Sequence, residues 1–423
     1  MNNLGRFGMA AALVVALAGY QQSSQVKAAG GPPQAANGSF RVLAPIESGN
    51  LLLFPVVREA GKSPGETPFI TLDEGIRAGE VEVTEAGNVR GLVRPRRPVP
   101  KPNVSPQYQD DRFRGYPDNP SRGDEVNTLV LVNHSSKPLL LLAGEIVTGG
   151  KQDRVIAKDR IVPVGADPID LSVFCIEPGR WTESSPTFGA AGKASGGSFM
   201  VQPTVRERAM VEKDQQQVWD SVHGAISTME MAAAPPASAS MRGSMGNSGA
   251  QYDMPSPRAM GTTSYAKVMQ SNAVSEKVDE AAAPVMKSRD QVLAQLRQEH
   301  AVGVVVAVRG EIVWADLFAD TELLSRYWTK LVRSYAAESL TQGETHAAPS
   351  LADAQHFLDA PSGGTETTEG DVGIYRYREL KSGSTETFVL ESLLPGTGYD
   401  VHISKMQLIT QKRRIKHYPQ MLR

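Results

Sequence analysis

Residues 125–181 consist of short apolar runs separated by glycine, proline or small polar residues. The runs in "EVNTLVLVNHSSKPLLLL" flank Asn133-His134-Ser135-Ser136, whose composition is typical of a hairpin loop. "DRVIAKDRIVPV" and "PIDLSVFCIEPGRW" contain further runs, each bounded by glycine or proline. Short strands at this spacing predict a sandwich-like or barrel-like sheet rather than alternating strand–helix–strand units.

The 423-residue chain is long enough for more than one domain. We expect a β-rich domain over residues 40–231, with a long helix over 203–231, and a smaller α/β portion with a basic tail over 287–423. Residues 232–286 are predicted to be a low-complexity insertion. Residues 94–123 are rich in proline, which removes backbone donors, so they are predicted to be a loop outside any sheet. This organisation predicts an α+β fold.

Two helices have recognisable ends or faces. Thr71 is predicted to cap the N-terminus of a helix that stops at Gly79. A hairpin turning at Arg309-Gly310-Glu311 precedes an amphipathic helix. The apolar residues of that helix recur at helical spacing: Leu323, Leu324, Tyr327, Trp328, Leu331, Val332 and Tyr335. Asp316, within the strand run before this helix, is expected to cap a helix start, with a catalytic carboxylate as the alternative.

The N-terminus has the features of an export signal. Arg6 supplies a positive charge, and the apolar run at 9–19 is too short for a resident membrane helix, which needs about 20 residues. Tyr20 stands where a lipoprotein would carry its lipidated cysteine, so no lipid anchor is expected there. We therefore predict a cleaved signal peptide over 1–18, a disordered lead-in over 19–39, and a periplasmic or extracellular protein. An apolar N-terminal helix of a cytoplasmic protein is the alternative.

The composition excludes several classes of function. Lys and Arg total 44 against 46 Asp and Glu, and this balance argues against nucleic-acid binding. Cys175 is the only cysteine, and its apolar neighbours predict a buried thiol rather than a nucleophile. The seven histidines lack ligand spacing, so no metal site is predicted, and no cofactor motif is found. No later apolar run is long enough to cross a membrane, and the oligomeric state is not predicted.

Unusual polar side chains follow two of the apolar strands. "GEIVTGGKQDR" and "CIEPGRW" contain these candidates: Glu145, Lys151, Gln152, Arg154, Glu177, Arg180 and Trp181. Glycines at 149 and 150 would let backbone N–H groups approach a ligand closely. The basic residues suit carboxylate or phosphate, Gln152 would orient the ligand, and Trp181 would stack on it. Glu145 and Glu177 would serve as acid and base if their environments separated their pKa values. A structural network of ion pairs is the alternative.

These motifs resemble a family named ARG and rhodanese-phosphatase-superfamily-associated protein. Its signature resembles G-E-x-x-x-G-[GA]-K-Q-[ND]-R-V followed by C-x-E-x-G-R-W, which occur here at 144–155 and 175–181. The resemblance covers most of residues 40–231 and returns at 300–336. Asp153 stands where the family often has Asn, and its negative charge weakens a purely anionic-ligand interpretation.

The resemblance implies an association with particular kinds of domain, and it does not imply a particular reaction. The family name records association with ADP-ribosylglycohydrolase and phosphatase-like domains, which implies a role near ADP-ribose or a related phosphorylated nucleotide-sugar. We therefore hold two hypotheses. The chain either binds or processes a small anionic ligand of this kind, or it is a non-catalytic envelope module for structure or interaction. The sequence does not distinguish an enzyme from a binding protein.

Overall fold

The computed structural model of the chain describes residues 40–59, 68–85, 128–180, 182–192, 198–234, 261–287, 289–341, 343–362 and 364–408. The predicted signal peptide, lead-in and proline-rich loop lie outside the described residues, and so does Trp181. The other six candidate site residues are all described.

A nine-stranded antiparallel sheet, here called the large sheet, has the order β1-β3-β13-β14-β18-β17-β16-β15, with β2 paired to β3. Its strands are β1 (Phe40–Val42), β2 (Ile46–Ser48), β3 (Leu51–Arg58), β13 (Ala301–Val308), β14 (Glu311–Phe318), β15 (Thr365–Asp371), β16 (Tyr375–Ser382), β17 (Thr385–Ser392) and β18 (Asp400–Gln407). Because β3 pairs with β13, the sheet joins segments from both sides of the predicted insertion. The hairpin predicted to turn at Arg309-Gly310-Glu311 is confirmed, since β13 pairs with β14.

The remaining strands, together with α1 (Leu72–Ala78), form the barrel lobe. They are β4 (Ile70–Thr71), β5 (Val81–Glu85), β6 (Thr128–Asn133), β7 (Leu139–Leu141), β8 (Ile146–Thr148), β9 (Arg154–Ile156), β10 (Arg160–Val162), β11 (Ile169–Cys175) and β12 (Gly189–Ala190). Six of them have the order β12-β8-β9-β11-β6-β5. A bridge between Thr84 and Thr187 links β5 to the segment before β12, so this sheet is nearly closed. The predicted α+β fold with a barrel-like part is confirmed.

The other helices are α2 (Pro203–Glu207), the π-helix η3 (Arg208–Glu212), α3 (Gln215–Ala233), α5 (Tyr265–Gln270), α6 (Asn272–Lys287), α7 (Arg289–Gln298), α8 (Thr321–Ser339) and α9 (Leu351–Asp359). The ends predicted for α1 are confirmed: Thr71 forms a capping box with Glu74, and Gly79 adopts a left-handed φ of 71°. The apolar face predicted for α8 is buried throughout.

Two predicted boundaries differ from the structure. The helix predicted over 203–231 is interrupted, because η3 ends at Lys213 with a φ of 51° and Asp214 then caps α3. The insertion predicted over 232–286 is too long, because its last part forms α5 and most of α6. A composition rich in alanine and serine is compatible with helix when neighbouring helices bury one face, which is why composition alone misplaces this boundary.

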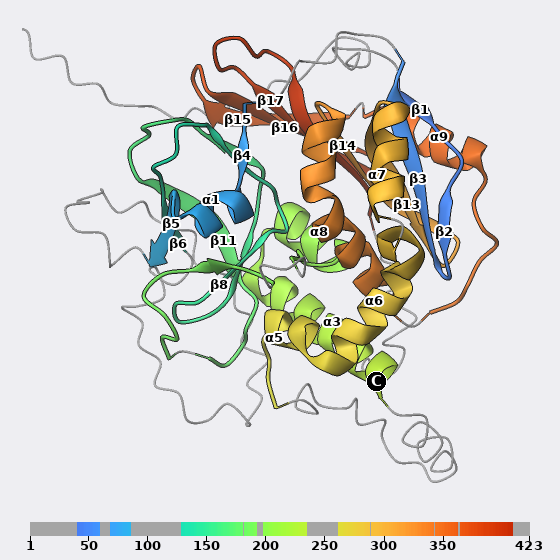
Figure 1. Ribbon diagram of the computed structural model, residues 1–423, viewed down its shortest axis with the longest axis horizontal. Helices are drawn as coiled ribbons and strands as arrows, with labels where there is room; N and C mark the ends of the chain where they lie inside the picture. The colour runs from blue at the N-terminus through green and yellow to red at the C-terminus, as the bar shows by residue number, and fades with distance from the viewer. Residues whose placement is uncertain are drawn as a thin grey trace, which may run out of the picture.

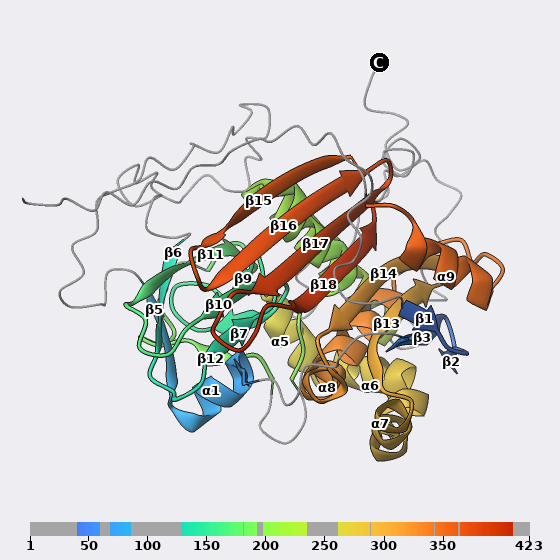
Figure 2. The same cartoon turned by 90° about the horizontal axis from the view of Figure 1, so that it is seen from above.

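In the β1–β3–β13–β14 part of the large sheet, α6, α7 and α8 cover one face and α9 packs on the other (Figures 1 and 2). Neighbouring residues of a strand point to opposite faces, so the side chains of β3 alternate between two cores. Leu51 and Leu53 pack in the core shared with α6, α7 and α8, whereas Leu52 and Phe54 pack in the core shared with α9. Strands buried on both faces explain the near-continuous apolar sequences of β3 and β13.

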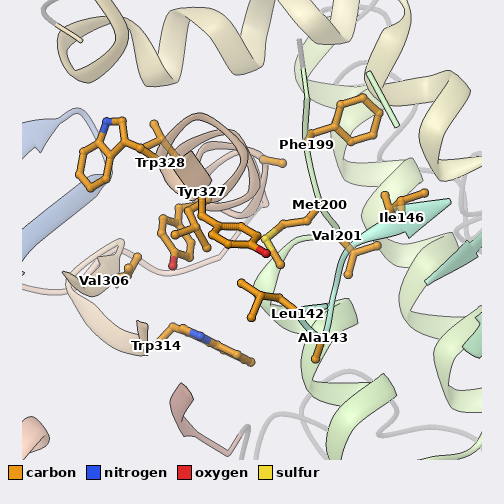
Figure 3. Close-up of a cluster of buried hydrophobic side chains, with 14 of the residues drawn as sticks. Leu142, Ala143, Ile146, Phe199, Met200, Val201, Val306, Trp314, Tyr327 and Trp328 are labelled. Carbon is orange, nitrogen blue, oxygen red and sulfur yellow. The ribbon is translucent and has the colours of Figure 1, made fainter. Parts of the chain in front are cut away.

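Helix α8 lies between the large sheet and the barrel lobe. Figure 3 shows the shared core, where Tyr327 of α8 and Trp314 of β14 lie toward Leu142, Met200 and Val201. The Tyr327 hydroxyl donates to the carbonyl of Leu140 at 3.2 Å. A hydroxyl bound in this way keeps the aromatic ring in an apolar core without an unpaired polar atom.

A buried ion pair anchors α8 to the barrel lobe. The Lys330 ammonium lies 2.5 Å from Glu145 and 3.0 Å from Asp73, at the start of α1. Burial lowers the pKa of Lys330, but the two carboxylates more than offset this and keep it above its ordinary value. The ammonium therefore stays charged, and removing it leaves the buried carboxylate of Glu145 without a cation.

Lys330→Met should lower the free energy of unfolding by about 3–5 kcal/mol, because it breaks a buried pair by removing one partner. Urea denaturation of the full chain measures this loss. Arg297→Ala is the matched control, since its pair with Glu322 is half exposed and should be worth no more than about 1 kcal/mol. Equal losses in the two variants would contradict the anchoring role of Lys330.

Candidate functional site

The two signature stretches meet at one end of the barrel lobe, here called the signature corner. It comprises the turn between β8 and β9 (149–153), the first residue of β9, Arg154, the segment 175–180 at the end of β11, Glu85 at the end of β5, and residues 263–267 at the start of α5. The antiparallel ladders β8–β9 and β9–β11 bring the first two segments together. Sequence patterns predicted these two segments, but not Glu85 or α5.

The two glycines of the turn serve packing within the protein. A Cβ on Gly149 would lie 2.7 Å from the carbonyl oxygen of Thr187, and one on Gly150 would lie 2.3 Å from the Phe188 ring. The turn's N–H groups are also occupied: Gly149 donates to Asp153, Gly150 to the carbonyl of Ser185, and Lys151 to Glu85. The expectation that these glycines admit a ligand is therefore wrong, because another segment of the chain fills the space.

Arg180 is held by five hydrogen bonds within the protein. Its Nε donates to Glu177 at 2.6 Å, and its remaining donors reach Asp153 and the carbonyls of Gly149, Gly150 and Thr182. A guanidinium has five N–H donors, so no donor is left for a ligand in this conformation. Arg180 fixes the turn against the end of β11.

Glu177 and Asp153 connect the corner to α5. Glu177 accepts from Lys267 at 3.1 Å and from the backbone of Asp153, while Asp153 accepts from the Ser264 hydroxyl at 2.7 Å. Burial and the neighbouring Glu177 raise the pKa of Asp153 above its ordinary value. This carboxyl is therefore disposed toward its neutral form more than an exposed aspartate is.

Arg154 and Glu145 are also engaged in the interior. Arg154 is fully buried, lies 3.7 Å from Glu85, and donates to the carbonyl of Gln152. Glu145 accepts from the backbone of Leu142 and pairs with Lys330 on α8. Burial raises the pKa of Glu145, and Asp73 beside it shares the same cation. Glu145 and Glu177 thus engage different cations on different helices.

Gln152 and Lys151 differ from the rest of the corner. Gln152 is fully buried, yet neither its amide oxygen nor its amide nitrogen has a hydrogen-bond partner among the described residues. Lys151 is partly exposed, and its ammonium pairs with none of the described residues. Among the described residues of the corner, these two side chains have polar terminal groups without a partner.

Cys175 behaves as the core thiol that its neighbours predict. It is buried, and burial raises its pKa to about 11, which leaves almost no thiolate at neutral pH. The side-chain amide of Gln215, at the start of α3, accepts from the backbone N–H of Cys175 and donates to its carbonyl, each at 2.9 Å. Gln215 therefore continues the hydrogen bonding of β11 where the ladder ends.

A second polar cluster, here called the buried charge network, lies between the barrel lobe and the large sheet. Its members are at most 1% exposed: Asp159, Arg206, Asp316, Tyr335, His402 and Ser404. His402 contacts Asp159 through Nδ1 at 2.6 Å and Asp316 through Nε2 at 3.1 Å. Arg206 donates to Asp316 at 2.9 Å and to Ser404 at 2.9 Å. The members of the network therefore hydrogen-bond and pair with one another in the interior and are not accessible to solvent.

Within this network, His402 and Asp316 are both biased toward their charged forms. Burial lowers the pKa of His402, but the carboxylates of Asp159 and Asp316 raise it above its ordinary value. Burial raises the pKa of Asp316, but Arg206 and His402 hold it well below its ordinary range. The expectation that Asp316 caps a helix is wrong: it lies inside β14, and Asp320 caps α8.

The family model of the ARG and Rhodanese-Phosphatase-superfamily-associated Protein domain matches residues 39–406. The chain belongs to this family. The family domain therefore spans the large sheet, the barrel lobe and the signature corner together. No curated protein and no solved structure matches the chain.

Among the described residues, no group of three or more His, Cys, Asp or Glu side chains is arranged to hold a metal ion. None of the described helices has the length and apolar character needed to cross a membrane.

Replacing Gly150 by alanine tests the packing of the turn. Gly150→Ala should cost about 1–3 kcal/mol more than Gly165→Ala, because the added methyl meets the buried Phe188 ring. Gly165 has a similar left-handed φ, and a Cβ there meets nothing within 4 Å, so its variant reports the backbone cost alone. Urea denaturation measures both, and equal costs would refute the close approach at Gly150.

The pH dependence of stability tests the charge on His402. Its folded pKa lies above the unfolded value of about 6.5, so protonation stabilises the fold fully below about pH 6.5 and ever less as the pH rises through the folded pKa. Over that window the free energy of unfolding should fall by up to about 1.4 kcal/mol per pH unit because of this group. His402→Gln should remove this component, and the exposed His134→Gln should retain it. Parallel profiles for all three proteins would contradict a charged His402.

Proposed function

We propose that this protein binds a small anionic ligand at the signature corner and does not catalyse its conversion. The observation that carries the proposal is Gln152, whose buried side-chain amide has no partner among the described residues. Leaving such a group unpaired costs about 1–3 kcal/mol. The neighbouring N–H groups and Arg180 are all paired, so an unpaired amide among them favours a partner from outside the chain.

The charge of the corner favours an anion. Four cations, Lys151, Arg154, Arg180 and Lys267, accompany three carboxylates, Glu85, Asp153 and Glu177, so the corner has a surplus positive charge when all are ionised. The surplus falls on Lys151, since the other three cations each pair with a carboxylate. A partly exposed ammonium of this kind binds phosphate as a point charge.

The ligand we propose is a phosphorylated nucleotide-sugar of the ADP-ribose type. Lys151 would contact a phosphate, and Gln152, with one acceptor and two donors, would bind a polar edge of the same molecule. The end of a barrel is a common position for such sites. The family description includes the ARG domain, which gives ADP-ribose priority among the ligands to be tested. Trp181, which follows Arg180, remains a predicted stacking residue.

Binding is favoured over catalysis by the state of the candidate acid and base. Glu177 is held by Lys267 and Arg180, and Glu145 by Lys330 on another helix. General acid–base catalysis needs a group that gains and loses a proton within reach of the substrate. Carboxylates fixed in buried ion pairs do not meet that requirement. We further propose that the protein is exported, on the strength of the N-terminal sequence pattern.

A non-catalytic structural or interaction module is the second candidate. It is favoured by the interior pairing of Arg154, Arg180 and Glu177, which makes much of the signature part of the framework. The two candidates differ in what they require of Lys151 and Gln152. Ligand binding needs both side chains, whereas a structural module needs neither of their terminal groups.

A thermal-shift and calorimetric titration of the full mature chain with ADP-ribose, ADP, ribose 5-phosphate and inorganic phosphate tests the proposal. At a ligand concentration about 100 times the Kd, binding should add about 2.7 kcal/mol to stability. Lys151→Ala should weaken binding about tenfold or more, because it removes the surplus charge. Lys137→Ala, in the hairpin between β6 and β7 away from the corner, is the control and should bind as the parent does.

Gln152→Leu gives the sharper test. It should abolish the ligand-dependent shift while leaving the free protein as stable as the parent or more so, because an apolar side chain replaces an unpaired buried amide. A Gln152→Leu protein that binds normally would contradict the role of this residue. The absence of a shift with every ligand would favour the structural module.

A further inference from the structure

The outer edge of β15 pairs with no other strand among the described residues. β15 is the last strand of the large sheet, at the sheet's margin in Figure 2, and it pairs with β16 alone. Most of its side chains are exposed. An edge strand presents backbone N–H and C=O groups with which a further strand can pair, so this edge is a candidate interaction surface.

The turn after β15 shows which of its backbone groups face outward. The N–H of Ile374 donates to the carbonyl of Asp371, so the backbone groups of Asp371 point toward the β15–β16 hairpin. Successive residues of a strand direct their N–H and C=O groups to opposite sides. The backbone groups of Glu366, Thr368 and Gly370 therefore face away from β16, and these three residues supply the hydrogen-bonding groups of the outer edge.

The sequence of β15 is suited to antiparallel pairing with a second copy of itself. When the pairing is centred on Thr368, all seven residues of the strand have an opposite residue. The opposed residues are Thr365 with Asp371, Glu366 with Gly370, Thr367 with Glu369, and Thr368 with Thr368. Charged residues on an edge usually prevent pairing, because like charges placed opposite one another destabilise a sheet. In this register every acidic residue lies opposite threonine or glycine.

The same register also matches the backbone groups of the outer edge. The residues whose N–H and C=O groups face outward are opposed to one another, and each opposed pair can exchange two hydrogen bonds. A pairing centred on Glu366 or on Glu369 would instead place two identical carboxylates opposite each other. Only the pairing about Thr368 uses the whole strand and keeps the acidic residues opposite uncharged ones.

Glu366 and Arg376 add an attraction between the two copies. Arg376 on β16 stands opposite Gly370 of its own chain, on the same face of the sheet as Glu366. Because Gly370 has no side chain, Glu366 of one copy can reach across Gly370 of the second copy to that copy's Arg376. Their Cα atoms would be two strand spacings apart, or about 10 Å, which the two extended side chains together span. Arg376 is half exposed and pairs with Glu391 on its other side.

We propose that two copies of this protein associate through β15, forming a symmetric dimer in which the two large sheets continue into one another across an antiparallel pair of strands. Two-fold symmetry makes the two contacts between Glu366 and Arg376 equivalent. The interface is small, so the dimer should exchange with the monomer at micromolar concentrations. β15 contains no residue of the signature corner, and the proposal does not depend on the proposed ligand.

Sedimentation velocity of the full mature chain, from about 1 to about 200 µM, tests the proposal in the range where such interfaces dissociate. The weight-average mass should rise from that of one chain toward that of two. Thr368→Pro should stay monomeric, because proline removes an N–H that faces the second copy. Its melting temperature should stay close to the parent's, since that N–H makes no bond to β16 and proline is tolerated at such edge positions.

A charge exchange identifies the partner as a second copy. Glu366→Arg and Arg376→Glu should each weaken self-association about tenfold or more, because each places like charges across the interface. An equimolar mixture of the two variants should associate as the parent does, because each chain then supplies the charge that the other lacks. Glu276→Arg, an equal change of charge at an exposed position of α6, is the control and should dimerise as the parent does.

Three results would overturn the proposal. A parent chain that stays monomeric over the whole range would show that no second copy pairs with β15. Dimers of undiminished affinity in Thr368→Pro would place the interface elsewhere on the molecule. Failure of the mixed charge variants to recover would remove the contact between Glu366 and Arg376, and this arm does not depend on how well the proline variant folds. Failure of the ligand titrations would leave all three readings unchanged, because no ligand is present.

Discussion

The fold depends on a set of buried charges that no single segment of the sequence contains. Two carboxylates and two cations pair with one another in the interior. The carboxylates are Asp159 from the barrel lobe and Asp316 from the large sheet, and the cations are His402 from the large sheet and Arg206 from α2. Each charge would be costly to bury alone, so the segments are stable only when they are assembled. The network therefore specifies how the barrel lobe sits on the sheet, in addition to the apolar core around α8.

The family signature contributes to the same assembly. Glu145 anchors α8 through Lys330, Arg154 closes the barrel end with Glu85, and Arg180 fixes the turn. Most of the motif is thus framework, and the ligand binding that we propose is assigned to Lys151 and Gln152. A rigid corner with one unpaired amide and one surplus cation is better suited to binding than to proton transfer.

Local features were predictable from the sequence, and long-range pairings were not. Thr71 and Gly79 mark α1 because capping uses residues within one turn, and the face of α8 follows from its own periodicity. The sequence around Asp316 predicts a helix cap, whereas its actual partners, Arg206 and His402, are 110 and 86 residues away and leave no local pattern. The prediction that the glycines of the turn admit a ligand fails for the same reason, because Thr187 and Phe188, distant in the sequence, occupy the space beside them.

The central claim is that the barrel lobe and the large sheet form one cooperative unit through the buried charge network and α8. Differential scanning calorimetry of the full chain tests it most directly. The account predicts a single transition whose calorimetric and van't Hoff enthalpies agree. Two separable transitions, with the barrel lobe melting apart from the sheet, would contradict it.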